Sequence, residues 1–245
     1  MVRYFIELAY NGSRYHGWQI QPGASSVQEE INRALSTLLR QDIYVVGAGR
    51  TDTGVHASFF VAHFDIECGL PEPQQVVYKL NGLLDKDIAI YKIYRVPMDK
   101  HARFSAISRT YKYYIDKTKD PFTYPFAWKA YPLPDIQAMN EACRVLFDYT
   151  DFTSFSKLHT DVKTNNCIIY EAQWEETDKQ LIFTVKANRF LRNMVRAIVG
   201  TLIDVGRGKL TPEDVRKIIE SKNRCNAGTS VPAQALFLCH IEYPE

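Results

Sequence analysis

The sequence predicts an α+β protein made of two halves that repeat one order of elements, β-α-β-β-α-β. Its 245 residues are 46% hydrophobic, which is enough to build one large core or two smaller ones. Some segments alternate apolar and polar residues as strands do, and others repeat apolar residues at helical spacing. The two kinds of segment follow one another in the same order twice, which favours antiparallel sheets with helices packed on them.

The first half begins with a strand, because apolar residues alternate from position 4 to position 10. A helix is predicted over 27–39, where apolar residues recur at helical spacing after Ser26 and Glu29, the pair that forms a capping box. Two strands, a helix after Pro73 and a closing strand complete the order, at 43–46, 60–66, 76–84 and 88–96.

The second half repeats this order with a strand, a helix, a hairpin, a helix and a last strand, at 110–116, 136–147, 167–175 with 181–187, 190–206 and 236–243. Thr211 and Pro212 open one additional helix, because a Thr cap followed by Pro suits a helix start. The sequence therefore predicts two ferredoxin-like halves, 1–105 and 106–245, whose antiparallel sheets merge across a central basic cleft.

The charge of the chain is nearly balanced, at a formal +2, and does not by itself indicate a nucleic-acid partner. Basic residues are concentrated, however, in two segments. Residues 100–119 hold six basic side chains and one acid, Asp116, and residues 186–209 hold six basic side chains and one acid, Asp204. Such runs are consistent with a solvated face or with a surface that holds an RNA backbone.

The composition also bears on where the protein works. Its five cysteines form no CxxC pair, and an odd number fits a reduced cytoplasmic protein better than a disulfide framework. The amino terminus alternates as a strand does and lacks the pattern of a signal peptide. Apolar stretches fall short of the ~18 residues that a membrane span needs. We therefore expect a soluble, cytoplasmic protein.

A glycine-rich loop between two predicted strands presents a carboxylate. Gly47, Gly49 and Gly54 surround Arg50 and Asp52, so the backbone can adopt conformations that other residues avoid. Taken alone, the aspartate fits a turn residue that hydrogen-bonds its own backbone. It also fits a catalytic group held on a tight loop, with the arginine pairing with it or with a phosphate.

This loop resembles the signature of the tRNA pseudouridine synthase A family, in the residues Gly49-Arg50-Thr51-Asp52-Thr53-Gly54-Val55-His56-Ala57. Further stretches similar to motifs of the same family follow in the same order, at 10–19, 26–29, 101–106, 109–113, 151–155 and 188–200. The resemblance covers nearly the whole chain and implies the pseudouridine synthase fold, with two ferredoxin-like halves.

The resemblance implies that Asp52 attacks or deprotonates the target nucleotide, so that the bond between uracil N1 and the ribose breaks and the base rejoins through C5. Such an isomerisation needs a nucleophile, proton handling and a tight pocket but no cofactor. The sequence contains no HExxH, P-loop or dinucleotide-binding motif, and its six histidines show no metal-ligand spacing. We therefore expect neither a cofactor nor a metal.

Two further catalytic residues are implied by the resemblance. Tyr111 corresponds to the tyrosine that lies against the target uracil, although an aromatic residue beside Tyr113 on a strand is also typical of core packing. Arg196 corresponds to the basic residue that keeps Asp52 ionised. Its spacing of i, i+3 and i+7 with Arg189 and Arg192 is also that of a solvated basic helix face.

The resemblance further implies a tRNA substrate, modified at uridines 38, 39 and 40 of the anticodon arm by a homodimer. A uridine in a stem must be flipped out at a cost of a few kcal/mol, which phosphate contacts help to offset. Leu236 is an expected apolar wall of the pocket, although residues 231–235 depart from the family's usual pattern. The other expected RNA contacts are Arg14, Tyr15, Arg50, Arg103, Phe104 and Lys157.

Three other classes of protein are alternatives to a synthase. A non-catalytic ferredoxin-like RNA-binding protein is the main alternative, but the chain has no aromatic RNP signature. A base deaminase would need zinc motifs that are missing. A glycoside hydrolase would need a second carboxylate that nothing in the sequence indicates. The chemical route of Asp52 and the division of roles between Arg50 and Arg196 stay open, as do the range of tRNAs and the oligomeric state.

Overall fold

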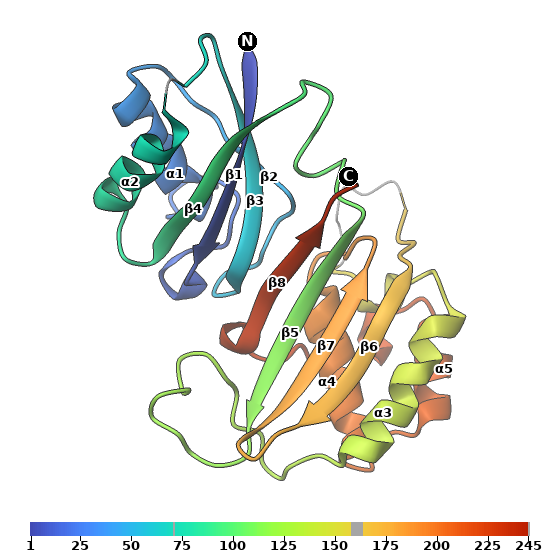
Figure 1. Ribbon diagram of the computed structural model, residues 1–245. Coiled ribbons are helices and arrows are strands. Elements are labelled where there is room, and N and C mark those ends of the chain that lie inside the picture. Colours follow the sequence, from blue (N-terminus) through green and yellow to red (C-terminus); the bar gives the residue numbers. More distant parts are fainter. Residues whose placement is uncertain (71, 158–163, 245) are drawn as a thin grey trace. The chain divides into compact units, whose positions relative to one another are not determined.

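The computed structural model describes residues 1–70, 72–157 and 164–244, which form two compact units (Figure 1). Unit 1 is Met1–Ile107 with Leu238–Glu245, and unit 2 is Ser108–Phe237. The sequence places the boundary at 105/106 and assigns 238–245 to the second half. The boundary lies at 107/108, and these last residues group with unit 1. A strand's alternation does not say which neighbours it will have.

Unit 1 contains the predicted β-α-β-β-α-β order: β1 (Val2–Tyr10), α1 (Val27–Leu39), β2 (Val46–Gly47), β3 (His56–Ile66), α2 (Pro73–Leu83) and β4 (Ile88–Val96). Its strands pair antiparallel in the order β4-β1-β3-β2, with Ile6 opposite both Ala62 of β3 and Ile93 of β4. The two helices cover one face of this sheet (Figure 1). This is the ferredoxin-like arrangement expected for the first half.

The helix α1 forms as its sequence predicts, because the Ser26 side chain accepts a hydrogen bond from the backbone N–H of Glu29 and Ile31 and Leu35 are fully buried. The predicted strand over 43–46 is wrong in part, since only Val46 and Gly47 form a strand.

Side chains of α1 hold the residues that precede β2 instead. Ser36 Oγ accepts from Ile43 N–H at 2.9 Å, and Asn32 Oδ1 accepts from Val45 N–H at 2.9 Å. The backbone of this segment therefore bonds to helix side chains rather than to a neighbouring strand.

Unit 2 contains β5 (Ser108–Asp116), α3 (Ile136–Val145), β6 (Ile169–Glu176), β7 (Gln180–Ala187), α4 (Met194–Gly206) and the additional helix α5 (Pro212–Glu220). The final strand, β8 (Leu236–Glu242), begins in unit 2 and ends in unit 1. Within unit 2, β5 and β6 both pair antiparallel with β7, and the helices lie on one face of these strands (Figure 1). The described residues thus confirm the α+β class.

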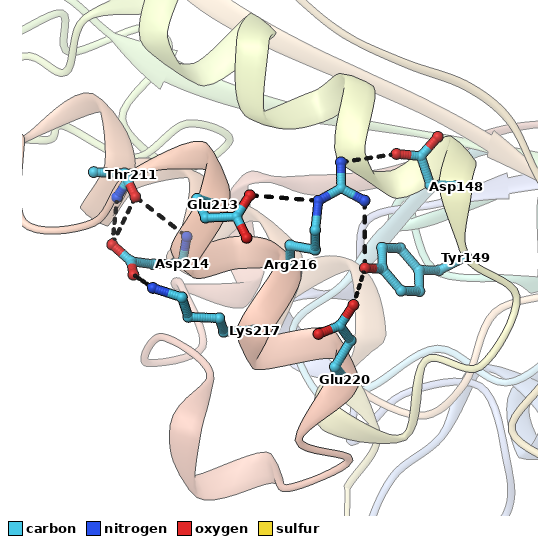
Figure 2. Close-up of polar contacts among 8 residues, drawn as sticks. All are labelled: Asp148, Tyr149, Thr211, Glu213, Asp214, Arg216, Lys217 and Glu220. Atoms are coloured by element: carbon cyan, nitrogen blue, oxygen red, sulfur yellow. Dashed lines mark hydrogen bonds and ion pairs between the residues drawn. The ribbon is translucent and has the colours of Figure 1, made fainter.

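The helix α5 forms as Thr211 and Pro212 predict. Thr211 and Asp214 make a reciprocal capping box, drawn in Figure 2. The helix is tied to the segment after α3, because Arg216 donates to Asp148 at 2.9 Å and the Tyr149 hydroxyl donates to Glu220 at 2.6 Å (Figure 2). These contacts lie at the surface and contribute little to stability individually.

The helix α4 begins at Met194 rather than near Phe190. Asn193, just before it, has a φ of 66°, a left-handed conformation that asparagine adopts more readily than most residues. The Arg192 carbonyl accepts a hydrogen bond from the backbone N–H of Lys157 at 3.1 Å. The expected first turn of the helix is therefore replaced by an irregular segment that bonds to other parts of unit 2.

No helix within the described residues is long and apolar enough to cross a membrane.

Candidate active site

The Asp52 loop, residues 49–56, lies in unit 1 between β2 and β3. Thr51 and Val55 are buried, Asp52 is half-buried, and Arg50 and Thr53 are exposed. The loop closes on itself through a hydrogen bond from the Val55 N–H to the Asp52 carbonyl at 3.1 Å. The carboxylate therefore stands on a tight turn that is anchored in the unit by the buried Thr51 and Val55.

One neighbouring stretch, the supporting segment of residues 10–18, holds this loop from several sides. The Tyr10 and Thr51 hydroxyls lie 2.8 Å apart in a buried hydrogen bond. His56 Nδ1 accepts from the Gly12 N–H at 3.0 Å, and the Gly54 N–H donates to the carbonyl of Tyr15 at 3.3 Å. The loop is thus fixed mainly by hydrogen bonds to a single segment that is distant from it in the sequence.

Two glycines of the supporting segment allow this close approach. A Cβ atom on Gly12 would lie 2.0 Å from the carbonyl oxygen of Val55, and one on Gly17 would lie 2.2 Å from that of Thr51. Gly17 also has a φ of +89°, which side-chain-bearing residues rarely adopt. The motif at 10–19 therefore supports the Asp52 loop, a role that its sequence alone did not reveal, although its paired glycines were a signal.

A cavity of about 70 Å³ opens beside the loop in unit 1. Arg50 and Arg103 both line it, together with Trp18, Tyr44 and uncharged residues; the full lining is Trp18, Gln19, Gln28, Tyr44, Val46, Gly47, Gly49, Arg50 and Arg103. The structure therefore brings two of the expected RNA-binding arginines to one place next to the Asp52 loop.

The candidate residues of unit 2 gather around the start of α4. Arg196 Nε donates to the Val231 carbonyl at 2.7 Å, and the Val231 N–H donates back to the Arg196 carbonyl at 3.3 Å. The buried Tyr113 hydroxyl donates to the Pro232 carbonyl at 3.0 Å. Burial raises the pKa of Tyr113, which keeps that donor protonated. The backbone at 231–232 is thereby fixed to the strand and the helix.

Tyr111 lies on β5, two residues before Tyr113 and on the same face of the strand. Its ring meets Phe190 edge to face, with centroids 5.1 Å apart and planes at 86°. Tyr111 is half-buried whereas Tyr113 is fully buried. Tyr113 therefore packs in the core, and Tyr111 stands nearer the surface.

The three arginines expected along one helix face do not lie on one helix. Only Arg196 belongs to α4, because Arg189 and Arg192 precede its start. Arg189 donates instead to the Thr164 carbonyl at 3.3 Å. The basic-face interpretation of this spacing is therefore wrong.

The remaining expected contacts lie in different surroundings. Arg14 is exposed and pairs with Asp85 at 2.6 Å and Asp87 at 2.9 Å. Lys157 is exposed at the end of the described segment before 158, and Leu236 is buried at the start of β8. Nothing within the described residues groups three or more His, Cys, Asp or Glu side chains in the manner of a metal site.

Comparisons with known proteins agree with this arrangement of motifs. A family model described as tRNA pseudouridine synthase matches residues 8–105 and 142–244. The tRNA pseudouridine synthase A of Bacteroides thetaiotaomicron is 60% identical over 248 residues, which cover 100% of this chain and 92% of that protein. That of Bacteroides fragilis is 59% identical over 244 residues, 99% of this chain and 97% of that protein.

A more distant relative shows the same extent of similarity. The tRNA pseudouridine synthase A of Bacillus subtilis is 38% identical over 250 residues, which cover 99% of each chain. The matched residues include the Asp52 loop, the supporting segment and the start of α4. On this agreement of the family model and full-length relatives, the chain belongs to the tRNA pseudouridine synthase family.

Proposed function

We propose that the protein converts uridine to pseudouridine at positions 38, 39 and 40 of the anticodon arm of tRNA, with Asp52 as its nucleophile. Membership of the family makes the chain an isomerase that acts on tRNA. The choice of uridines and the role of Asp52 go beyond that membership. They rest on the resemblance of the Asp52 loop and on its geometry.

The observation that carries the proposal is the way in which Asp52 is held. The buried Tyr10–Thr51 hydrogen bond precedes it, and the Gly54 N–H and His56 Nδ1 bond to the supporting segment after it. A carboxylate fixed on both sides loses little conformational freedom when a substrate binds. An ordinary surface turn would not need two glycines on a second segment to let it pack so closely.

The reaction is a redox-neutral rearrangement. The bond from the ribose C1′ to uracil N1 breaks, the base turns within the pocket, a bond from C1′ to C5 forms, and the C5 proton is lost while N1 regains a proton. Asp52 adds to the base, attacks the ribose or removes a sugar proton, and these routes need the same carboxylate. Tyr111 lies against the uracil and takes part in removing the C5 proton.

The two arginines have complementary roles in this proposal. Arg196 keeps Asp52 ionised, and its guanidinium is oriented by the hydrogen bond to Val231. Arg50 shares that task or holds the phosphate beside the extruded nucleotide. Leu236 forms an apolar wall, and no cofactor or metal is required.

The RNA backbone binds to the basic side chains of both units, and Phe104 provides an aromatic surface for a base. Arg103 and Arg50 contact phosphate from one cavity, and Arg14 and Lys157 add weaker contacts. The enzyme acts as a homodimer in the cytoplasm, where its tRNA substrates are found.

The test is a tritium-release assay on tRNA that carries 5-tritiated uridine, without added metal or cofactor. The wild type should release tritium, and Asp52→Ala and Asp52→Asn should lose at least about a thousandfold in rate, because they remove a nucleophile. Asp42→Ala, which removes an exposed carboxylate from another loop of unit 1, should keep wild-type activity. Binding of tRNA by the Asp52 variants, measured on filters, should be unchanged.

Transcripts with cytidine at position 38, 39 or 40 sharpen the result. Each replacement should remove the tritium released from that position alone. Tight, salt-dependent tRNA binding without tritium release by the wild type would overturn the enzymatic proposal and favour the non-catalytic RNA-binding alternative.

A further inference from the structure

The turn of residues 101–105, which follows β4 in unit 1, is capped by a histidine. His101 Nδ1 accepts from the backbone N–H groups of Arg103 at 3.1 Å and of Phe104 at 3.3 Å. The His101 N–H donates to Ser105 Oγ at 2.8 Å, and the Ser105 N–H donates to the His101 carbonyl at 2.9 Å. The imidazole thus does for this turn what an Asn or Asp side chain does at a helix start.

A second histidine anchors the same turn to the sheet. His63, buried on β3, accepts at Nδ1 from the Ala102 N–H at 3.2 Å. The Tyr243 hydroxyl donates to the Ala102 carbonyl at 2.7 Å, and Ala102 has no exposed surface. The rings of His63 and His101 meet at an angle of 64°, with centroids 4.5 Å apart. One residue of the turn is therefore fixed inside the unit by two side chains.

The next two residues of the turn point outward. Phe104 is 77% exposed, and the Arg103 guanidinium lies 5.5 Å from the centre of its ring. Arg103 also lines the cavity beside the Asp52 loop that Arg50 shares, and no carboxylate is among the described residues that line it. An arginine stacked on an aromatic ring beside a second arginine suits a phosphate and its adjoining base.

We propose that His101 and His63 are positioning residues that hold Arg103 and Phe104 in place for RNA, and that they do so only as neutral imidazoles. A neutral imidazole has one nitrogen that accepts hydrogen bonds, whereas a protonated one has none. Both Nδ1 atoms here accept from backbone N–H groups. The inference rests on the proposed function, because it assumes that the protein binds tRNA. It adds to that function the residues that orient Arg103 and Phe104.

Burial and the nearby arginines favour the neutral form of the two rings, and Asp65 opposes it. Arg3 of β1 and Asp65 of β3 face both histidines, and Arg103 faces His101. Burial, with Arg3 next in importance, lowers the pKa of His63 to about 4 and lowers that of His101 below its ordinary value. Because these folded-state values lie below those of the unfolded chain, the contacts are complete above about pH 6.5 and are lost as the pH falls through the folded pKa.

The test compares the KM for tRNA, the kcat and the filter-binding Kd of variants at pH 7.5. His101→Ala should raise KM and Kd by about five- to tenfold, the usual effect of losing a cap, and change kcat by less than about twofold. His101→Asn should restore binding, because its Oδ1 can accept from the same two N–H groups. Adding His101→Ala to Arg103→Ala should weaken binding by clearly less than the product of the two single effects, because part of the effect of His101 acts through Arg103.

The pH profile separates positioning from general stability. The ratio of wild-type Kd to His101→Asn Kd should be near one at pH 7.5 and rise about threefold or more by pH 5, because asparagine does not titrate. His240→Ala, which removes an exposed histidine of β8, should follow the wild type at every pH. This comparison also applies if His101→Ala fails to fold.

Three results would overturn the inference: unchanged binding by a folded His101→Ala, binding by His101→Asn as weak as by His101→Ala, or a double variant whose losses multiply. Filter binding reports the contact whether or not uridine is converted. A wild type that binds tRNA without releasing tritium would therefore refute the proposed function. The Kd values of the His101 variants would still decide this inference.

Discussion

The Asp52 loop in unit 1 and the start of α4 in unit 2 both carry candidate catalytic side chains, but they are held in different ways. The loop is fixed by backbone groups and the Tyr10 hydroxyl of the supporting segment, which lies on the other side of α1 in the sequence. The start of α4 is fixed by side chains, since Arg196, Tyr113 and Asn193 reach the backbone or hydroxyl groups of residues 230–232.

The two regions nevertheless share one device. In unit 2, a Cβ atom on Gly200 of α4 would lie 1.9 Å from the Thr229 carbonyl oxygen, and one on Gly228 would lie 2.7 Å from the Thr201 nitrogen. Each candidate region thus has glycines where two backbones touch. The difference lies in what surrounds that contact: a tight turn in unit 1 and a helix in unit 2. A turn should depend more on its glycine, because it has fewer other hydrogen bonds.

Gly17→Ala should have the largest effect. The added methyl would clash with the Thr51 carbonyl, and the φ of +89° is strained for alanine, so we expect a loss of at least about 3 kcal/mol in unfolding free energy. The rate of turnover should also fall, because the added methyl would displace Thr51 and with it the neighbouring Asp52. Urea denaturation and tritium release would measure the two effects.

Two other glycines make this test specific. Gly23 also has a positive φ, of +72°, but nothing lies within 4 Å of its Cβ position, so Gly23→Ala should cost only about 1 kcal/mol and leave turnover intact. Gly200→Ala should destabilise the protein through its clash, yet keep more turnover per folded molecule than Gly17→Ala. If Gly17→Ala and Gly23→Ala lost the same unfolding free energy and turnover, the close contact between Gly17 and the Asp52 loop would not be the cause of the Gly17→Ala effect.

The sequence predicted the Asp52 loop better than the start of α4, and the two kinds of support explain why. Alternation and helical spacing placed α1 to α4 and most strands, because they reflect which face is buried, and cap residues placed α5. The loop and its support are 41 residues apart at the Tyr10–Thr51 contact, but each lies within a recognisable motif of its own. The irregular start of α4 depends on a left-handed Asn193 and on bonds to residues 230–232, which apolar spacing does not reveal. Spacing therefore misplaced Arg189 and Arg192.

Tyr113→Phe and Tyr10→Phe test the support by hydroxyl groups in each region. Tyr113→Phe leaves the Pro232 carbonyl without this donor and should cost about 1–3 kcal/mol. Tyr10→Phe should cost about 1 kcal/mol, because the Thr51 hydroxyl can rotate toward another partner. The urea midpoint and kcat of both variants would be compared. If Tyr10→Phe lowered the unfolding free energy more than Tyr113→Phe did, side-chain hydroxyl groups would support the Asp52 loop more strongly than they support the start of α4.

Arg14→Ala should have the smallest effect, and it asks whether the supporting segment also contacts RNA. Arg14 and Asp85 are exposed whereas the side chain of Asp87 is only 11% exposed, so we expect a loss of less than about 1 kcal/mol in unfolding free energy. The two carboxylates beside Arg14 offset its charge, and we expect the Kd for tRNA to rise by less than about threefold. Asp85→Asn should tighten binding slightly, because it leaves more positive charge at the same place. A tenfold loss in Arg14→Ala would instead mean that RNA displaces both carboxylates, so that one segment would both support the Asp52 loop and hold the substrate.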